Sequence, residues 1–181
     1  MQLRADIQIK TVIKALKDVI VPAIDPANKL AVEQAHLAMG LLTLLSTQMP
    51  VQFRFDHDEL QRLVQASEKL ERVCKQDPEA SAELRRLKAA RAEAQHVLDK
   101  SRIDPARILD SIRALRADIS ALILTVEREE LGADQFTEAE KVVLDLSREQ
   151  LLRDRSLLIS LGNEIDPAAV PAIGTLLPHL D

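Results

Sequence analysis

The chain has 181 residues, of which 46% are hydrophobic and 29% are charged, and its formal net charge is −5. This balance predicts a folded globular protein and argues against disorder. Because the chain has no Trp, no Tyr and only three Phe, it lacks the aromatic faces on which many nucleic-acid-binding proteins stack bases, and an acidic surface binds phosphate backbones poorly. We therefore expect no nucleic-acid partner.

The first residues and the single cysteine bear on the cellular compartment. The start, MQLRADIQIK, has no apolar stretch typical of a signal peptide. The longest nearly apolar run, Leu37–Leu45, is about half of the length needed to span a bilayer. Cys74 has no second cysteine with which to form a disulfide. These features predict a cytoplasmic protein without a membrane-spanning segment.

Apolar residues recur at helical spacing along the whole chain, and no stretch alternates as a half-buried strand would. The pattern predicts six helices, at residues 3–21, 26–49, 58–75, 78–100, 105–131 and 138–161. The short connections between them favour antiparallel neighbours. The predicted fold class is all-α: an antiparallel up-and-down bundle of about six helices, with a four-helix core as the alternative.

Helix starts are marked by a repeated motif, IDPA, at residues 24–27, 103–106 and 165–168. In each copy the Asp can cap free backbone N–H groups, and Pro suits the first helical position. The Ile ahead of the Asp can pack onto the first turn, as Ile165 onto Val170. Thr137 and Glu140 form a capping box for the last helix. We therefore interpret these aspartates as helix caps and not as catalytic groups. Asp77-Pro78 fits either a turn or a kink.

The predicted domain organisation has two parts. Residues 1–166 form the helical bundle, and the apolar segment 167–181, which contains three Pro and one Gly, docks on the bundle or on a partner subunit. The longest connection is expected at residues 49–58, where Phe53 and Phe55 would close one end of the bundle. Cys74 continues the apolar stripe of its helix, which indicates a small core residue.

Two Glu-x-x-His pairs, Glu33 with His36 and Glu93 with His96, match half of the ligand set of a ferritin-like dinuclear metal site. Helical projection opposes this reading for Glu93 and His96, which lie opposite the apolar seam of their helix. Glu33 and His36 lie in a narrow polar stripe with leucines on one side and Val32 and Met39 on the other. The sequence leaves open that this stripe faces inward. We expect no cofactor, and we keep a bundle with a buried metal or an apolar small-ligand site as the alternative.

The helices at 26–49 and 138–161 carry more apolar surface than one core-facing stripe requires. On the second, Leu144, Leu151 and Leu158 form an extra row at seven-residue spacing, which suits pairing with another helix. No serine lies in a nucleophile-elbow motif and no glycine-rich phosphate loop occurs, so no catalytic residue is predicted. The sequence favours a non-enzymatic partner-binding or regulatory module, a homo-oligomer with its interface at the three leucines.

Overall fold

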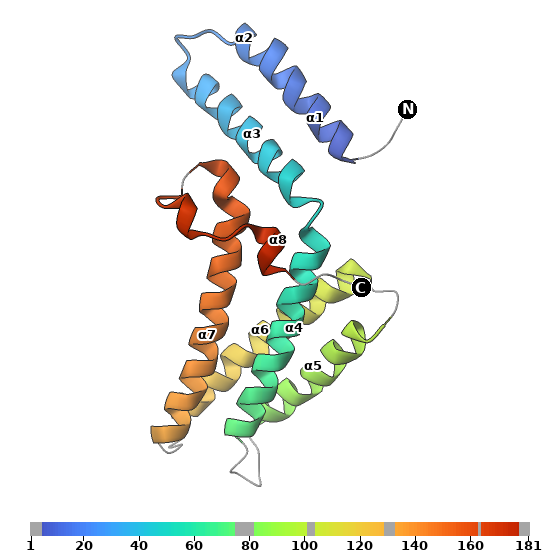
Figure 1. Cartoon of the computed structure of the whole chain (residues 1–181), viewed down its shortest axis with the longest axis vertical. Coiled ribbons are helices and arrows are strands. Elements are labelled where there is room, and N and C mark those ends of the chain that lie inside the picture. Colours follow the sequence, from blue (N-terminus) through green and yellow to red (C-terminus); the bar gives the residue numbers. More distant parts are fainter. Residues whose placement is uncertain (1–4, 75–81, 101–103, 129–132, 163, 178–181) are drawn as a thin grey trace. The chain divides into compact units, whose positions relative to one another are not determined.

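The computed structural model describes residues 5–74, 82–100, 104–128, 133–162 and 164–177. These residues are almost entirely helical and contain no strand, so the all-α prediction is confirmed. The longer helices are α1 (Ala5–Ala15), α3 (Lys29–Gln48), α4 (Gln52–Val73), α5 (Ala82–Leu98), α6 (Pro105–Arg128) and α7 (Ala133–Leu158) (Figure 1). The shorter elements are a π-helical turn (Leu16–Ile20), α2 (Val21–Ala23), two 3₁₀ turns (Ile159–Leu161 and Pro167–Ala169) and α8 (Ile173–Leu176).

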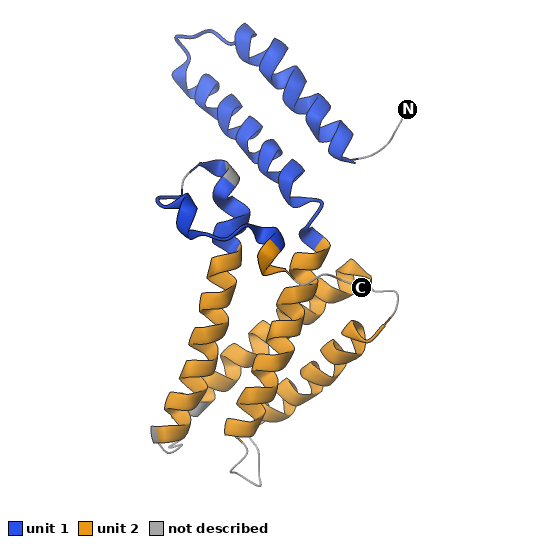
Figure 2. Ribbon diagram, in the orientation of Figure 1, with its two compact units in different colours: residues 1–52, 154–174 blue, residues 53–153, 175–181 orange. Residues whose placement is uncertain are grey.

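The chain divides into two compact units (Figure 2). Unit 1 comprises residues 1–52 and 154–174, and unit 2 comprises residues 53–153 and 175–181. The last turn of α7 therefore belongs to unit 1, and the chain returns to unit 2 within α8. The boundary at residue 166 that the sequence suggested stays a prediction.

Unit 2 is an up-and-down arrangement of α4, α5, α6 and α7 around one hydrophobic core (Figure 1). α4, α5 and α6 each supply several buried residues at helical spacing, and α7 supplies Ala139 together with the partly buried Val142, Val143 and Leu146. A helix that buries such a stripe gains most of its stability from packing. Cys74 lies in this core, as predicted. The core residues are Leu60, Leu63, Val64, Leu70, Cys74, Leu84, Leu87, Ala94, Val97, Ile108, Ile112, Leu115, Ile119, Leu122 and Ala139.

Unit 1 contains a helical hairpin and the end of α7. In the hairpin, α1 with its π-helical turn and α2 runs back against α3 through a short loop (Figure 1). The chain after α7 folds back on that helix, because Ser156 Oγ donates a hydrogen bond to the carbonyl of Pro171 at 2.7 Å and Arg155 pairs with Glu164 at 2.8 Å. Val170 is buried beside this turn.

Of the three aspartates predicted to cap helix starts, Asp104 is confirmed as a cap. α6 begins at Pro105, and the Ala106 amide donates to Asp104 Oδ1 at 3.0 Å, so Asp104 acts as predicted. Asp25 instead accepts from Ala27 in the loop. The cap of α3 is Asn28, and the helix starts at Lys29, three residues later than predicted.

Other predicted starts were wrong. Asp166 precedes a three-residue 3₁₀ turn, and its side chain makes no capping hydrogen bond. Ile165 is 99% exposed, so it does not pack on Val170. α7 begins at Ala133, which places Thr137 inside the helix where it cannot cap the start. Asp77-Pro78 and Ile103 lie outside the described residues.

The connection predicted at residues 49–58 is mostly helical, because α4 begins at Gln52. The predicted helix began at residue 58, because carboxylates such as that of Asp58 interact favourably with the dipole at a helix start. Asp58 instead lies inside α4 and is buried in an ion pair with Arg62, one turn later in the helix. Phe55 is buried as part of this helix.

Candidate functional site

The α1–α3 hairpin exposes apolar side chains along its length. Among the described residues of α1, the π-helical turn, α2 and α3, Leu44 is the only buried one. Nine large apolar side chains are at least 40% exposed, namely Ile7, Val12, Val19, Ile20, Leu30, Leu37, Leu41, Leu45 and Met49. An apolar surface of this extent marks an interaction site in many proteins.

The apolar spacing of the first two predicted helices indicates core-facing stripes, which include Val12 and Val19 in the first helix and Leu45 and Met49 in the second. All four are exposed instead, which corrects this interpretation. The physical reason is that two helices enclose too little volume to bury more than one side of each. The sequence contained a signal for this surface, because α3 has only two charged residues, Lys29 and Glu33.

A groove of ≈ 680 Å³ lies within unit 1 between α3 and the turn that follows α7. Its lining is mostly apolar, with Lys29, Glu33 and His36 as the polar members. Gly40 forms part of the wall, and a Cβ placed there would meet no atom within 4 Å. The full lining is Pro26, Lys29, Val32, Glu33, His36, Leu37, Gly40, Leu41 and Leu161.

The candidate metal ligands are exposed on two helices in different units. Glu33 and His36 are exposed on α3, so their stripe does not face a core. Glu93 and His96 are exposed on α5, and Glu93 forms an ion pair with Arg107 at 2.6 Å. Within the ranges that the structure describes, no three His, Cys, Asp or Glu residues lie together in a way that could hold a metal ion.

The leucine row of α7 is exposed. Leu144, Leu151 and Leu158 expose 46%, 58% and 44% of their surface, whereas Ala139 of the same helix is fully buried. This pattern agrees with the sequence pattern of a second apolar row. Its assignment as an oligomer interface stays an untested prediction, and the hairpin surface is the competing candidate.

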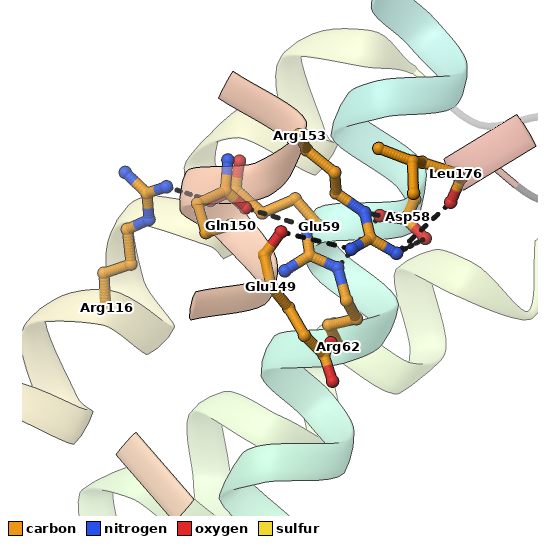
Figure 3. Close-up of polar contacts among 8 residues, drawn as sticks. All are labelled: Asp58, Glu59, Arg62, Arg116, Glu149, Gln150, Arg153 and Leu176. Atoms are coloured by element: carbon orange, nitrogen blue, oxygen red, sulfur yellow. Dashed lines mark hydrogen bonds and ion pairs between the residues drawn. The ribbon is translucent and has the colours of Figure 1, made fainter. Parts of the chain in front are cut away.

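Unit 2 contains a cluster of buried charges that was not predicted from the sequence (Figure 3). Asp58 in α4 accepts from Arg62 Nε at 2.9 Å and pairs with Arg153 Nε of α7 at 2.6 Å. Arg62 also donates to Gln150 of α7 at 2.7 Å. Beside them, Glu59 pairs with Arg116 of α6 at 2.5 Å. The sequence signal was Asp58 with Arg62 at a spacing of four, but such pairs are usually exposed and their burial could not be foreseen.

Asp58, Arg62 and Arg153 carry two positive charges against one negative charge. Buried charges are tolerated when hydrogen bonds satisfy them. The charge of Arg153 is satisfied in this way, because its guanidinium donates hydrogen bonds to the backbone carbonyls of Glu149 and Leu176, both at 3.2 Å. Arg62 Nη1 is buried and has no hydrogen-bond partner in the described part of the chain.

Two more side chains of unit 2 are perturbed by burial. Desolvation lowers the pKa of His57 below its ordinary value, and the nearby charge of Asp58 opposes this shift. Desolvation raises the pKa of the Cys74 thiol. Cys74 thus lacks the stabilised thiolate that a nucleophile requires.

Comparisons with protein-family models, with curated proteins and with solved structures find no match to this chain. The described helices include none that is both long and apolar enough to cross a membrane.

Proposed function

We propose that this chain is a non-enzymatic binding module that associates with a second copy of itself through the α1–α3 hairpin. The observation that carries the proposal is the hairpin's surface, on which nine large apolar side chains are exposed while Leu44 alone among its described residues is buried. In unit 2, four helices with similar spacing bury a common core. Two hairpins packed together supply the same number of helices.

The apolar area is large enough to support association. Each Leu, Ile, Val or Met side chain contributes roughly 1.5–3 kcal/mol when it becomes fully buried. Association of two proteins costs roughly 4–15 kcal/mol in lost translation, rotation and side-chain ordering. Because the nine side chains are already partly covered and expose 40–67% of their surface, each contributes roughly half of that value. Burial of all nine on each copy therefore offsets the cost.

The charge of the hairpin is compatible with a second copy as the partner. Residues 5–48 contain four acidic residues, Asp6, Asp18, Asp25 and Glu33, and four basic ones, Lys10, Lys14, Lys17 and Lys29. Their formal charges sum to zero, although the whole chain carries −5. Two hairpins consequently do not repel each other, which removes an electrostatic barrier to self-association.

Gly40 is a second feature that suits a close contact. Glycine inside a helix is less favourable than alanine by about 0.8–1 kcal/mol, and no neighbour within 4 Å in the described chain requires it. A helix of a second copy that approaches the groove at Gly40 would benefit from the missing side chain.

The proposal is tested by the substitution Leu41→Glu, with Leu124→Glu as the matched control. Leu41 lies on α3 and Leu124 on α6, and they expose similar fractions, 59% and 55%. We expect Leu41→Glu to convert a dimer into a folded monomer and Leu124→Glu to leave the dimer intact, as measured by light scattering with circular dichroism as the check of folding. A wild type that is monomeric at about 50 μM, well above a Kd in the low micromolar range, would refute it.

The groove favours one alternative function, the binding of a small apolar molecule. Its volume of ≈ 680 Å³ falls in the range of ligand pockets, which are mostly apolar with a few polar groups. Lys29, Glu33 and His36 would then contact the polar end of the ligand. Binding of an apolar fluorescent probe that Leu41→Glu abolishes in a protein that remains monomeric would favour this alternative.

A further inference from the structure

The C-terminal segment meets unit 2 through a distinctive set of contacts. Leu177 is 3% exposed. Arg54 of α4 donates to the carbonyl of Leu177 at 2.9 Å, and Arg153 of α7 donates to the carbonyl of Leu176 at 3.2 Å (Figure 3 shows the second contact). These contacts involve the side chain of Leu177 and two backbone carbonyls of the segment.

The two carbonyls lie at the C-terminal end of α8. The last carbonyls of a helix have no partner within the helix and carry the negative end of its dipole. Arginine side chains stabilise such an end by donating to the carbonyls. Since the donors bind backbone atoms, any leucine-containing helical turn that ends at this place can make the same contacts.

The cleft that receives the segment extends beyond it. One part, of ≈ 460 Å³, is lined by α4, by α7 and by Thr175, Leu176 and Leu177. A second part, of ≈ 330 Å³, continues between α4 and α7. Arg62, Gln65 and Glu149 line both parts, so the two parts form a continuous cleft.

Arg62 supplies an independent indication that this cleft takes a ligand. The residue is 8% exposed, and its Nη1 is a buried donor that no atom of the described residues satisfies. Such a donor is costly when it remains unpaired. A bound peptide that extends into the part of the cleft that Arg62 lines would bring a carbonyl oxygen to this donor.

We propose that the α4–α7 cleft is a peptide-binding groove whose ligand is a leucine-containing helical turn, and that residues 175–177 occupy it as an internal competitor. The contacts lie within unit 2, so the inference does not depend on self-association of the hairpin. The internal segment acts at an effective concentration in the millimolar range, as short tethers do. Binding of a peptide in trans is weakened by the fraction of molecules in which the groove is already filled.

The test uses a fluorescently labelled peptide with the sequence of residues 170–178 and the full-length protein. Two variants release the internal segment: Leu177→Glu, which removes its anchor, and a flexible Gly/Ser insertion of about twelve residues after Ala172, which lowers its effective concentration. We expect both to bind the peptide at least tenfold more tightly than the wild type does. The insertion variant keeps every native side chain, so it carries the test if Leu177→Glu fails to fold.

Two controls distinguish peptide binding in this groove from non-specific binding. Adding Arg153→Met to the insertion variant should weaken peptide binding at least tenfold, while Arg148→Met should not, because Arg148 pairs with Asp145 on an exposed part of α7 and does not line the cleft. Asp58 keeps Arg62 as its partner in the Arg153 variant. A folded insertion variant that binds the peptide no better than the wild type does, or binds equally well a peptide with Glu at the position of Leu177, would overturn the proposal.

Discussion

Replacing Gly40 with leucine should stabilise the single chain and at the same time weaken its self-association. Gly40 is an interior residue of α3, where glycine costs about 0.8–1 kcal/mol relative to alanine and leucine ranks close to alanine. A Cβ at this position meets no atom within 4 Å, and the groove beside it has room for the rest of the side chain. The free energy of unfolding of the monomer should rise by about 0.5–1 kcal/mol.

The effect on association has the opposite sign because the new side chain occupies the groove. The leucine would lie beside Leu37, Leu41 and Leu161, in the space that the second copy requires. We expect the dimer Kd to rise at least tenfold, which corresponds to about 1.4 kcal/mol. Gly40→Ala adds only one methyl group and should give the same gain in stability with a smaller loss of association.

Urea unfolding at protein concentrations below the dimer Kd measures the first effect, and sedimentation equilibrium measures the second. A Gly40→Leu protein that is more stable but dimerises as tightly as the wild type would show that the groove is not part of the interface. A less stable monomer would show that the reasoning about open space at Gly40 is wrong.

Four further changes have defined outcomes. Asp104→Ala should lower the free energy of unfolding by about 0.5–2 kcal/mol in urea titrations, because the bond from the Ala106 amide is lost; no change would remove Asp104 as a cap. Leu151→Glu should change that free energy by less than about 0.5 kcal/mol, since the side chain is 58% exposed; a large loss would place it in a core. The lowered pKa of His57 disfavours the charged imidazole in the folded state, so the free energy of unfolding should decline as the pH falls below about 6.5, the ordinary pKa of histidine. His57→Gln should reduce this decline in urea titrations between pH 7.5 and 5.5. Cys74, buried and with a raised pKa, should react with a thiol reagent at pH 8 much more slowly in buffer than in denaturant.

Helical spacing predicted much of the fold because it depends on a local property of the chain. The buried rows of α5 and α6, such as Leu84 with Leu87 and Leu115 with Leu122, can be read from the sequence alone. The cap at Asp104 is equally local. Boundaries failed where tertiary contacts decide them, as at Asp58, whose carboxylate resembles a cap but pairs with Arg153, 95 residues away.

The surface of the hairpin and the peptide groove were harder to predict for a different reason. The apolar spacing in α1 and α3 predicts that one face of each helix packs against another part of a protein. The spacing is the same whether that part belongs to the same chain or to another copy. Arg54 and Arg153 are two of many arginines in the sequence, and only the return of residues 175–177 to unit 2 gives them their role.

The most direct test of the central claim is an isotope-filtered methyl NMR experiment on a mixture of labelled and unlabelled chains, which detects only contacts between copies. If the hairpin is the interface, intermolecular contacts should appear at the methyl groups of Leu37 and Leu41, which are exposed in the single chain. Contacts confined to Leu144, Leu151 and Leu158, or no intermolecular contact at a protein concentration of several hundred micromolar, far above a micromolar Kd, would contradict the proposal.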